Sequence, residues 1–336
     1  GLAIYENDIS AAIYADSRAV VTLFVGMACI LAIGLADDLF NPPAKWRLLA
    51  IVGVAAFTWL GGNQIELLEV PQMGIFELGV LSAPVTILWI VGVIVAFNFI
   101  DGLDGLAAGI ALIASITMFI MALITNNVLW MTWTGAIAGS LLGFLVFNFN
   151  PASIFMGDSG SNFLGYMMAV IAIGTTQKES TGIALLIPML VLGLPILDAA
   201  LTMLRRALLR EGMFLSERGH LHHRLLDMGI SHRDVVLTLW GVTLLLCLGG
   251  LTFLTDVDRL QILLGVTISG TVFGLMFFTG YVRPHDLRTM WNRGLANLAR
   301  DKALAKLSTD LAQTVSSTST PDDLGSVLEK LTSDGG

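Results

Sequence analysis

Long runs of apolar residues alternate with short polar segments over most of the chain, and this pattern predicts transmembrane helices. Crossing the ~30 Å hydrocarbon core takes about 20 mostly apolar residues. Nine stretches approach that length: 20–36, 48–62, 79–100, 105–125, 128–149, 162–176, 182–203, 235–254 and 260–281. The second and sixth are short. We expect an all-α protein, a polytopic transmembrane bundle of about nine spans.

Composition supports a membrane protein. Hydrophobic residues make up 55% of the 336 positions and charged residues only 13%, far from the balance of a soluble domain. The net charge of -8 comes from acids scattered through loops and tail, so we expect no nucleic-acid partner. Cys29 and Cys247 lie inside predicted spans and indicate no disulfide framework.

The basic residues predict how the spans are oriented. Alternating the nine spans across a membrane puts fifteen Lys and Arg residues on one side and three, Arg18, Lys178 and Arg259, on the other. Basic residues accumulate on the cytoplasmic side of membrane proteins. Four polar motifs fall on this same side. We therefore expect an active site at the cytoplasmic surface, where a water-soluble substrate and a lipid head group can meet.

The first motif is the pair Asp37 and Asp38 at the end of the first span, followed by Lys45 and Arg47. Adjacent carboxylates after an apolar run are costly unless a cation or a proton-transfer role holds them there. The alternative is a solvated loop that ends the helix, with two prolines as helix breakers.

The second motif, from Asn98 to Gly105, joins two spans with almost no loop. Its glycines allow a tight turn, and Asp101 and Asp104 can point to one side of a helical turn. Ordinary turn residues are the alternative. They do not account for two acids that must remain near the lipid boundary.

The third motif runs from Asn148 through Phe155 and Gly157 to Asp158 and Ser159. A proline ends the preceding helix and Gly-Asp-Ser-Gly-Ser opens the next, so backbone N–H groups at a helix start could face a phosphate or a metal-bound phosphate. An ordinary N-cap by Asp158 or Ser159 uses the same geometry.

The fourth motif contains His220, His222 and His223, flanked by Arg218 and Arg224, in the largest cytoplasmic loop. Three histidines in four residues fit a metal site, a phosphate site or an exposed polar loop. The neighbouring arginines favour phosphate recognition.

Together the motifs predict phosphoryl transfer. Five aspartates on one face imply Mg²⁺, with Mn²⁺ as the alternative, because this cation binds through a few carboxylates plus substrate phosphates. A cationic loop would then cover the phosphates. An ion-coupled transporter with intramembrane carboxylates is the competing interpretation, but its site would lie near the bilayer midplane.

The strings GLADDLF, NFIDGLDGLAAG, NPASIFMGDSGSNFLG and HLHHRLLDMG resemble, in order, the polyprenyl-phosphate N-acetylhexosamine-1-phosphate transferases, relatives of the phospho-MurNAc-pentapeptide translocase. The resemblance implies a bundle of ten or eleven spans in the bacterial inner membrane. It also implies Mg²⁺-dependent transfer of a sugar phosphate from a UDP-N-acetylhexosamine to undecaprenyl phosphate, with release of UMP. The HLHH form resembles the N-acetylglucosamine-type members. The sequence leaves a homodimer open.

The resemblance also implies roles for the motif residues. By it, Asp37 and Asp38 act on the lipid phosphate, Asp158 holds the metal, and Asp101 and Asp104 lie near the nucleotide. The remaining candidates are the uridine-pocket residues Asn148 and Phe155, the catalytic histidines His220, His222 and His223 over the diphosphate, and the substrate-binding residues Lys45, Asn98, Gly157, Arg218 and Arg224.

Three regions are expected along the chain. Residues 1–17 form a polar stretch that starts with Gly rather than Met, and the family resemblance suggests a truncated start. Residues 18–282 would form the transmembrane catalytic domain. Residues 283–336 would form a cytoplasmic tail with an amphipathic helix on the membrane surface, or alternatively a dispensable solubilising tail.

Overall fold

The computed structural model describes residues 17–70, 74–176, 186–209, 220–253 and 258–278, and five isolated positions between 300 and 309. The chain divides into two compact units, 1–202 with 216–281, and 203–215 with 282–336. Helices dominate the first unit: α2 (Ser17–Phe40), α3 (Ala44–Leu60), α4 (Ser82–Ile100), α5 (Leu106–Ile124), α6 (Val128–Asn148), α7 (Gly157–Thr176), α8 (Leu186–Val191), α10 (Leu221–Asp227), α11 (His232–Thr252) and α12 (Asp258–Phe278). Helix α9 (Gly193–Leu209) begins in this unit. The expected all-helical class is confirmed.

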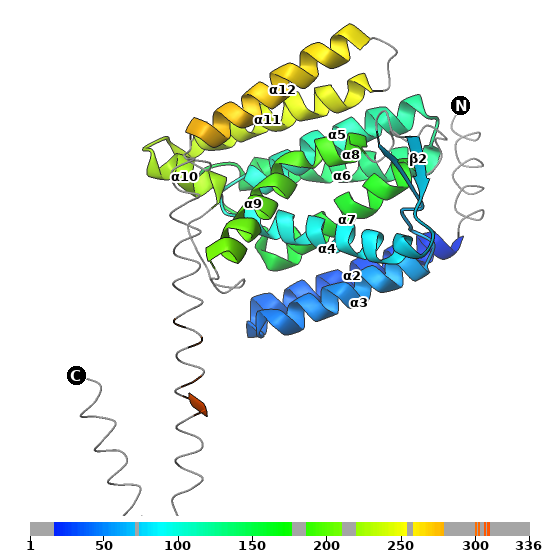
Figure 1. Ribbon diagram of the computed structural model, residues 1–336, viewed down its shortest axis with the longest axis horizontal. Coiled ribbons are helices and arrows are strands. Elements are labelled where there is room, and N and C mark those ends of the chain that lie inside the picture. Colours follow the sequence, from blue (N-terminus) through cyan, green and yellow to red (C-terminus); the bar gives the residue numbers. More distant parts are fainter. Residues whose placement is uncertain are drawn as a thin grey trace, which may run out of the picture. The chain divides into compact units, whose positions relative to one another are not determined.

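The helices of the first unit lie in successive layers (Figure 1). Helices α2 and α3 pack together, α7 lies against both α2 and α4, and α5 packs on α6 and α11. Helix α7 is the centre of this arrangement, since Tyr166, Met168 and Ile171 have no exposed surface. Its first turn is thereby held at the place where three other helices end or begin.

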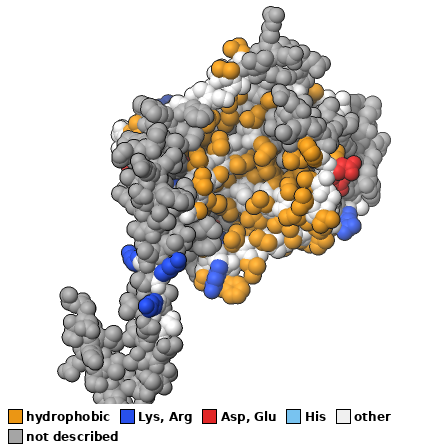
Figure 2. Space-filling view, viewed as in Figure 1, with side chains coloured by type: hydrophobic (Ala, Val, Ile, Leu, Met, Phe, Trp, Pro, Cys, Tyr) orange, Lys and Arg blue, Asp and Glu red, His pale blue; other side chains and the backbone are white. Residues whose placement is uncertain are grey.

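Five of the described helical segments are long and apolar enough to cross a membrane: Ser17–Phe40, Gly79–Ile100, Leu106–Ile124, Val128–Asn148 and His232–Thr252. Many of their large apolar side chains face outward, among them Leu88, Val146 and Leu244. Figure 2 shows hydrophobic side chains spread over one face of the molecule, with few charged side chains among them. A bilayer is the solvent that suits such a surface, so the expected polytopic membrane protein is confirmed.

The seventh predicted span, 182–203, is not one continuous helix in its described part. Helix α8 ends at Val191 and α9 begins at Gly193. Pro195 explains the break, because it lacks the N–H that a continuous helix would bond to the Val191 carbonyl. The interruption gives α9 its own start, and α9 carries an aspartate, Asp198, whose role is described below.

A short β-hairpin, which the apolar pattern does not predict, connects α3 to α4. Strands β1 (Leu67–Val70) and β2 (Gly74–Glu77) pair antiparallel with Leu67 opposite Glu77. The hairpin follows the end of α3 and precedes α4, so the polar motifs at the end of α2 and the end of α4 lie at the opposite ends of these helices. The connectivity thus places those motifs at one end of the bundle.

Candidate functional site

One cavity of about 410 Å³ gathers most of the residues that the sequence singles out. Its lining comes from the end of α2, the α4–α5 connection, the end of α6 and the segment leading into α7. The lining residues are Asp38, Asn98, Asp101, Gly102, Leu103, Asp104, Asn148, Phe155, Met156, Gly157 and Asp158. Three motifs that are far apart in the sequence therefore form one site, as the motif pattern predicts.

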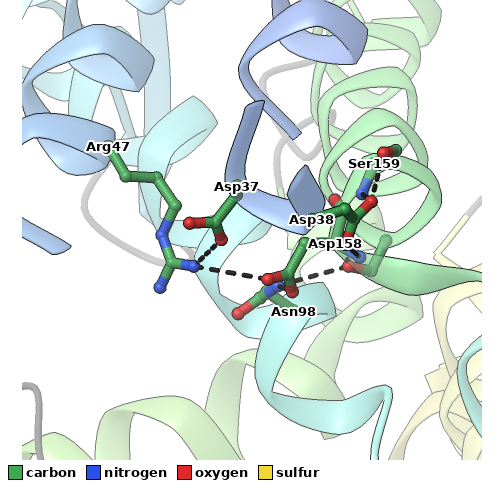
Figure 3. A network of polar contacts seen from close by, with 7 residues as sticks. Asp37, Asp38, Arg47, Asn98, Asp158 and Ser159 are labelled. Carbon is green, nitrogen blue, oxygen red and sulfur yellow. Dashed lines mark hydrogen bonds and ion pairs between the residues drawn. The ribbon is translucent and has the colours of Figure 1, made fainter. Parts of the chain in front are cut away.

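Asp158, in the first turn of α7, contacts residues of α3 and α4 through its carboxylate (Figure 3). The Asn98 amide donates to Asp158 Oδ1 over 2.6 Å, and Arg47 Nη1 lies 3.5 Å from Oδ2. Arg47 also forms an ion pair with the buried Asp37. Separating a buried ion pair leaves an uncompensated charge and is costly. The pair with Asp37 of α2 therefore keeps the Arg47 side chain beside Asp158 of α7.

Asp38 caps the start of α7. Its carboxylate accepts hydrogen bonds from the backbone N–H groups of Asp158, at 2.9 Å, and Ser159, at 3.0 Å, and from the Ser159 hydroxyl. Helix starts leave such N–H groups without intrahelical partners and favour negative charge. A Cβ at Gly34 would lie 2.4 Å from Ser159 Cα, so only glycine allows α2 to approach α7 this closely.

This cap corrects two expectations. Neither Asp158 nor Ser159 caps α7 with its own side chain among the described contacts, and the helix-start N–H groups expected to face a phosphate are occupied by Asp38. The physical reason is the close packing of α2 on α7, which brings a carboxylate within reach that a linear reading of the sequence cannot place there.

The α4–α5 connection presents the two acids of the second motif differently. Asp104 Oδ2 accepts hydrogen bonds from the Asn150 side chain and the Ala152 backbone N–H, each over 3.1 Å, so it ties this connection to the loop after α6. Asp101 is half-buried, and its burial, together with the negative charge of Asp158, raises its pKa to about 7. The cavity thus concentrates negative charge.

Two further residues shape the cavity wall. Asn148 Oδ1 accepts from the Gly105 N–H over 3.1 Å, and its amide donates to the Ile154 carbonyl over 2.9 Å. Gly105 has φ +77°, a left-handed conformation that favours glycine. Phe155 is 72% exposed, so its ring is free to contact a flat ligand in the cavity.

The histidine motif lies behind this wall. His220 is the N-cap residue of α10, and His222 is 1% exposed and lacks a hydrogen-bond partner on both ring nitrogens among the described residues. A Cβ at Gly102, a cavity residue, would lie 2.4 Å from His222 Nε2. Burial lowers the pKa of His222 to about 3, with the adjacent His223 acting in the same direction. His222 is therefore neutral at pH 7, and the expected cationic cover does not include it.

An exposed polar loop, one of the alternatives for this motif, does not describe His220 and His222, because both are buried. Asp198 explains how His220 is held. The His220 Nδ1 atom lies 2.9 Å from Asp198 Oδ2, and the Leu221 N–H donates to Asp198 Oδ1 over 2.8 Å. Asp198 is not among the residues predicted from the sequence, although a lone acid in an apolar stretch is an available signal.

The remaining candidates lie outside the cavity. Asp37 is buried behind it, and Lys45 is exposed, with its Nζ 5.7 Å from the Trp46 ring. His223 and Arg224 lie in α10 and are partly exposed. Arg218 lies outside the described residues. Arg47, predicted from the sequence only as a neighbour of the first motif, forms an ion pair with Asp158.

The donor set of the cavity fits a hard cation. Four aspartates line it, Asp38, Asp101, Asp104 and Asp158, and carboxylate oxygens are the ligands that Mg²⁺ takes in proteins. Across the described part of the chain, no three His, Cys, Asp or Glu side chains are close enough together to hold a metal by themselves. A Mg²⁺ ion here would complete its shell with water and substrate oxygens, as this ion commonly does.

Comparison with known proteins gives concordant matches. The sequence profile of glycosyl transferase family 4 matches residues 20–176. The probable undecaprenyl-phosphate N-acetylglucosaminyl 1-phosphate transferase of Bacillus subtilis (strain 168) is 39% identical over 245 residues, which cover 71% of this chain and 68% of the relative.

Two further relatives extend the comparison. The decaprenyl-phosphate N-acetylglucosaminephosphotransferase of Mycobacterium tuberculosis (strain ATCC 25618 / H37Rv) is 34% identical over 284 residues, 77% of this chain and 70% of the relative. The phospho-N-acetylmuramoyl-pentapeptide-transferase of Moorella thermoacetica is 37% identical over 207 residues, 61% of this chain and 62% of the relative.

Proposed function

Because the chain belongs to glycosyl transferase family 4, we propose that it transfers N-acetylglucosamine-1-phosphate from its UDP-sugar to undecaprenyl phosphate and releases UMP. The observation that carries this proposal is the convergence of four aspartates on one cavity at the end of the bundle. The relatives named for N-acetylglucosamine phosphate transfer and the HLHH form of the histidine motif support this sugar.

The reaction is a displacement at phosphorus. An oxygen of the lipid phosphate attacks the sugar-bearing phosphorus of the donor, the bond from that phosphorus to the bridging oxygen breaks, and UMP leaves with that oxygen. A phosphate monoester has a second pKa of about 6, so the attacking group is mostly a dianion near pH 7. The protein therefore has little proton transfer to perform, and positioning and charge neutralisation carry the catalysis.

Asp158 would hold Mg²⁺, with Mn²⁺ as the alternative. When bound, the ion would supply positive charge that offsets the negative charge developing on the leaving group. Asn98 and Arg47 orient Asp158 through the contacts described above. Asp101 and Asp104 line the same cavity, where the nucleotide would bind, and the exposed Phe155 ring offers a surface on which uracil could stack.

The histidine motif approaches the same cavity from α10. His222 has two ring nitrogens without partners among the described residues and lies against Gly102. A neutral imidazole can donate one hydrogen bond to a phosphate oxygen, so a small movement of Gly102 and its neighbours would give His222 access to the donor diphosphate.

The same reasoning proposes a location. The three motifs that share the cavity lie at one end of the bundle, and the distribution of Lys and Arg favours the cytoplasm for that end. We therefore place the site at the cytoplasmic face of a bacterial inner membrane, where UDP-sugars and the head group of undecaprenyl phosphate meet.

The test is an assay of the purified full chain in nanodiscs with undecaprenyl phosphate and Mg²⁺. UDP-N-acetylglucosamine, UDP-N-acetylgalactosamine and UDP-MurNAc-pentapeptide are supplied separately, and both UMP and lipid-linked sugar are measured. UMP formed in equal amount to the lipid product, with the first donor preferred, is the expected result. No UMP with any donor would refute the proposal, and preference for another donor would refute the sugar assignment.

A further inference from the structure

Asp198 is a buried acid that the cavity does not use. It is 4% exposed and lies on α9 in an otherwise apolar stretch. An acid in such surroundings is costly unless it has specific partners. Its two carboxylate oxygens contact consecutive residues of the histidine motif, His220 and Leu221.

These two contacts fix both the side chain and the backbone of the motif. A carboxylate only accepts hydrogen bonds, so the His220 ring must donate to Asp198. The donating hydrogen therefore lies on Nδ1, and the neutral ring carries no hydrogen on Nε2. The other carboxylate oxygen takes the Leu221 N–H, one of the groups that the start of α10 leaves without an intrahelical partner. Asp198 thus sets the ring orientation of His220 and the start of α10.

Two close contacts connect His220 to the cavity wall. The rings of His220 and His222 are nearly parallel, 6° apart, with centroids separated by 5.8 Å. His222 in turn lies so close to Gly102 that a Cβ there would come within 2.4 Å of Nε2. Gly102 lines the cavity beside Asp101 and Asp104.

We propose that Asp198 is the positioning residue of the histidine motif: it fixes His220 with its hydrogen on Nδ1 and fixes the start of α10, which seats His222 behind Gly102 at the cavity wall. The inference rests on the proposed function for its effect on turnover, but the hydrogen on Nδ1 is a property of the protein itself. The two parts are tested separately.

The first test replaces Asp198 with Asn, which keeps the shape. The amide has one acceptor oxygen where two are needed, so it cannot accept from both His220 and Leu221. We expect kcat to fall at least about tenfold, with a smaller change in the donor KM. Asp198→Glu keeps both acceptors and should recover part of the loss. Thr202→Val is the matched control, because the Thr202 hydroxyl lies 3.4 Å from the same nitrogen, and it should stay near wild-type turnover.

The second test is independent of activity. Nitrogen NMR of [¹⁵N]histidine-labelled full chain in nanodiscs, with the His220 signals assigned by comparison with His220→Gln, reports which ring nitrogen carries the hydrogen. Neutral His220 should carry it on Nδ1 in the wild type. In Asp198→Asn, the single amide oxygen should keep the Leu221 N–H, which cannot give up its hydrogen, and the amide NH₂ should then face Nδ1. The ring hydrogen of His220 should therefore move to Nε2.

The outcomes separate the two proposals. A wild-type spectrum with the His220 hydrogen on Nε2 overturns the proposed role of Asp198, whatever the activity. This result needs only the wild-type protein, so it holds even when Asp198→Asn does not fold. Unchanged kcat in a folded Asp198→Asn variant of an active protein overturns it as well. Absence of transferase activity in the wild type refutes the proposed function, while a wild-type hydrogen on Nδ1 would still support the contact.

Discussion

Replacing Asp101 with Asn should stabilise the metal-free protein above neutral pH while it impairs turnover. The pKa of Asp101 is about 7 in the folded chain against an ordinary value of 3.8. Below pH 4 the group is protonated in both folded and unfolded states and costs nothing. Between pH 4 and 7 only the unfolded state ionises freely, so stability falls by about 1.36 kcal/mol per pH unit. Above pH 7 the penalty is constant at up to about 4 kcal/mol.

Asn does not titrate, so the variant escapes this penalty. Relative to the wild type, it should gain about 2 kcal/mol at pH 5 and about 4 kcal/mol at pH 8. At roughly 2–4 °C per kcal/mol, the apparent Tm should be several degrees higher at pH 8, and the difference should shrink to about half at pH 5. The measurement is thermal unfolding in detergent with EDTA at a fixed heating rate, because membrane proteins often unfold irreversibly.

Asp104→Asn is the matched control for this experiment. Asp104 accepts two hydrogen bonds through one carboxylate oxygen, so an amide placed there should lower the Tm or leave it unchanged. A gain in Tm for Asp101→Asn that is the same at pH 5 and pH 8 would refute the reasoning, because it would show that ionisation of the buried group is not the cause.

Further predictions concern the metal, the cavity wall and the topology. Asp158→Asn should reduce turnover by orders of magnitude in a folded protein, and it should abolish the rise in Tm that Mg²⁺ gives the wild type; near-normal turnover would place the metal elsewhere. Gly102→Ala should lower both Tm and kcat because its Cβ meets His222, whereas Gly92→Ala, whose added Cβ meets open space, should lower neither; equal losses in the two would contradict the close contact. Cysteine at Lys45 should resist an impermeant thiol reagent in intact cells, and labelling from outside would exclude a cytoplasmic site.

Much of the fold could be predicted because a membrane helix requires a long run of apolar residues, which is visible in the sequence. The apolar runs at 79–100, 105–125 and 128–149 correspond closely to α4, α5 and α6. Where helices are interrupted, the same signal fails. Hydropathy does not register that Pro195 removes one backbone hydrogen bond, so the break between α8 and α9 was missed. The β-hairpin between α3 and α4 was missed for a related reason, since four-residue strands leave too short a pattern.

The site could be predicted as a set of residues but not as a set of contacts. Each motif contains polar groups that an apolar run does not need, and that excess is visible in the sequence. Which carboxylate meets which cation depends on how helices pack. Arg47 reaches Asp158 across 111 positions of the chain, and Asp198 meets His220 across 22. No spacing rule within one helix reaches over such separations.

The packing also separates two adjacent aspartates that the sequence treats as a pair. Asp37 is buried and bound to Arg47, so only Asp38 reaches the cavity. For Asp38 to act as a nucleophile, its carboxylate would have to leave the two N–H groups and the hydroxyl that it binds at the start of α7. At about 1 kcal/mol for each hydrogen bond, this adds about 3 kcal/mol to the barrier, or roughly a hundredfold in rate. Direct attack by the lipid phosphate leaves the cap of α7 intact, and this difference favours the direct route.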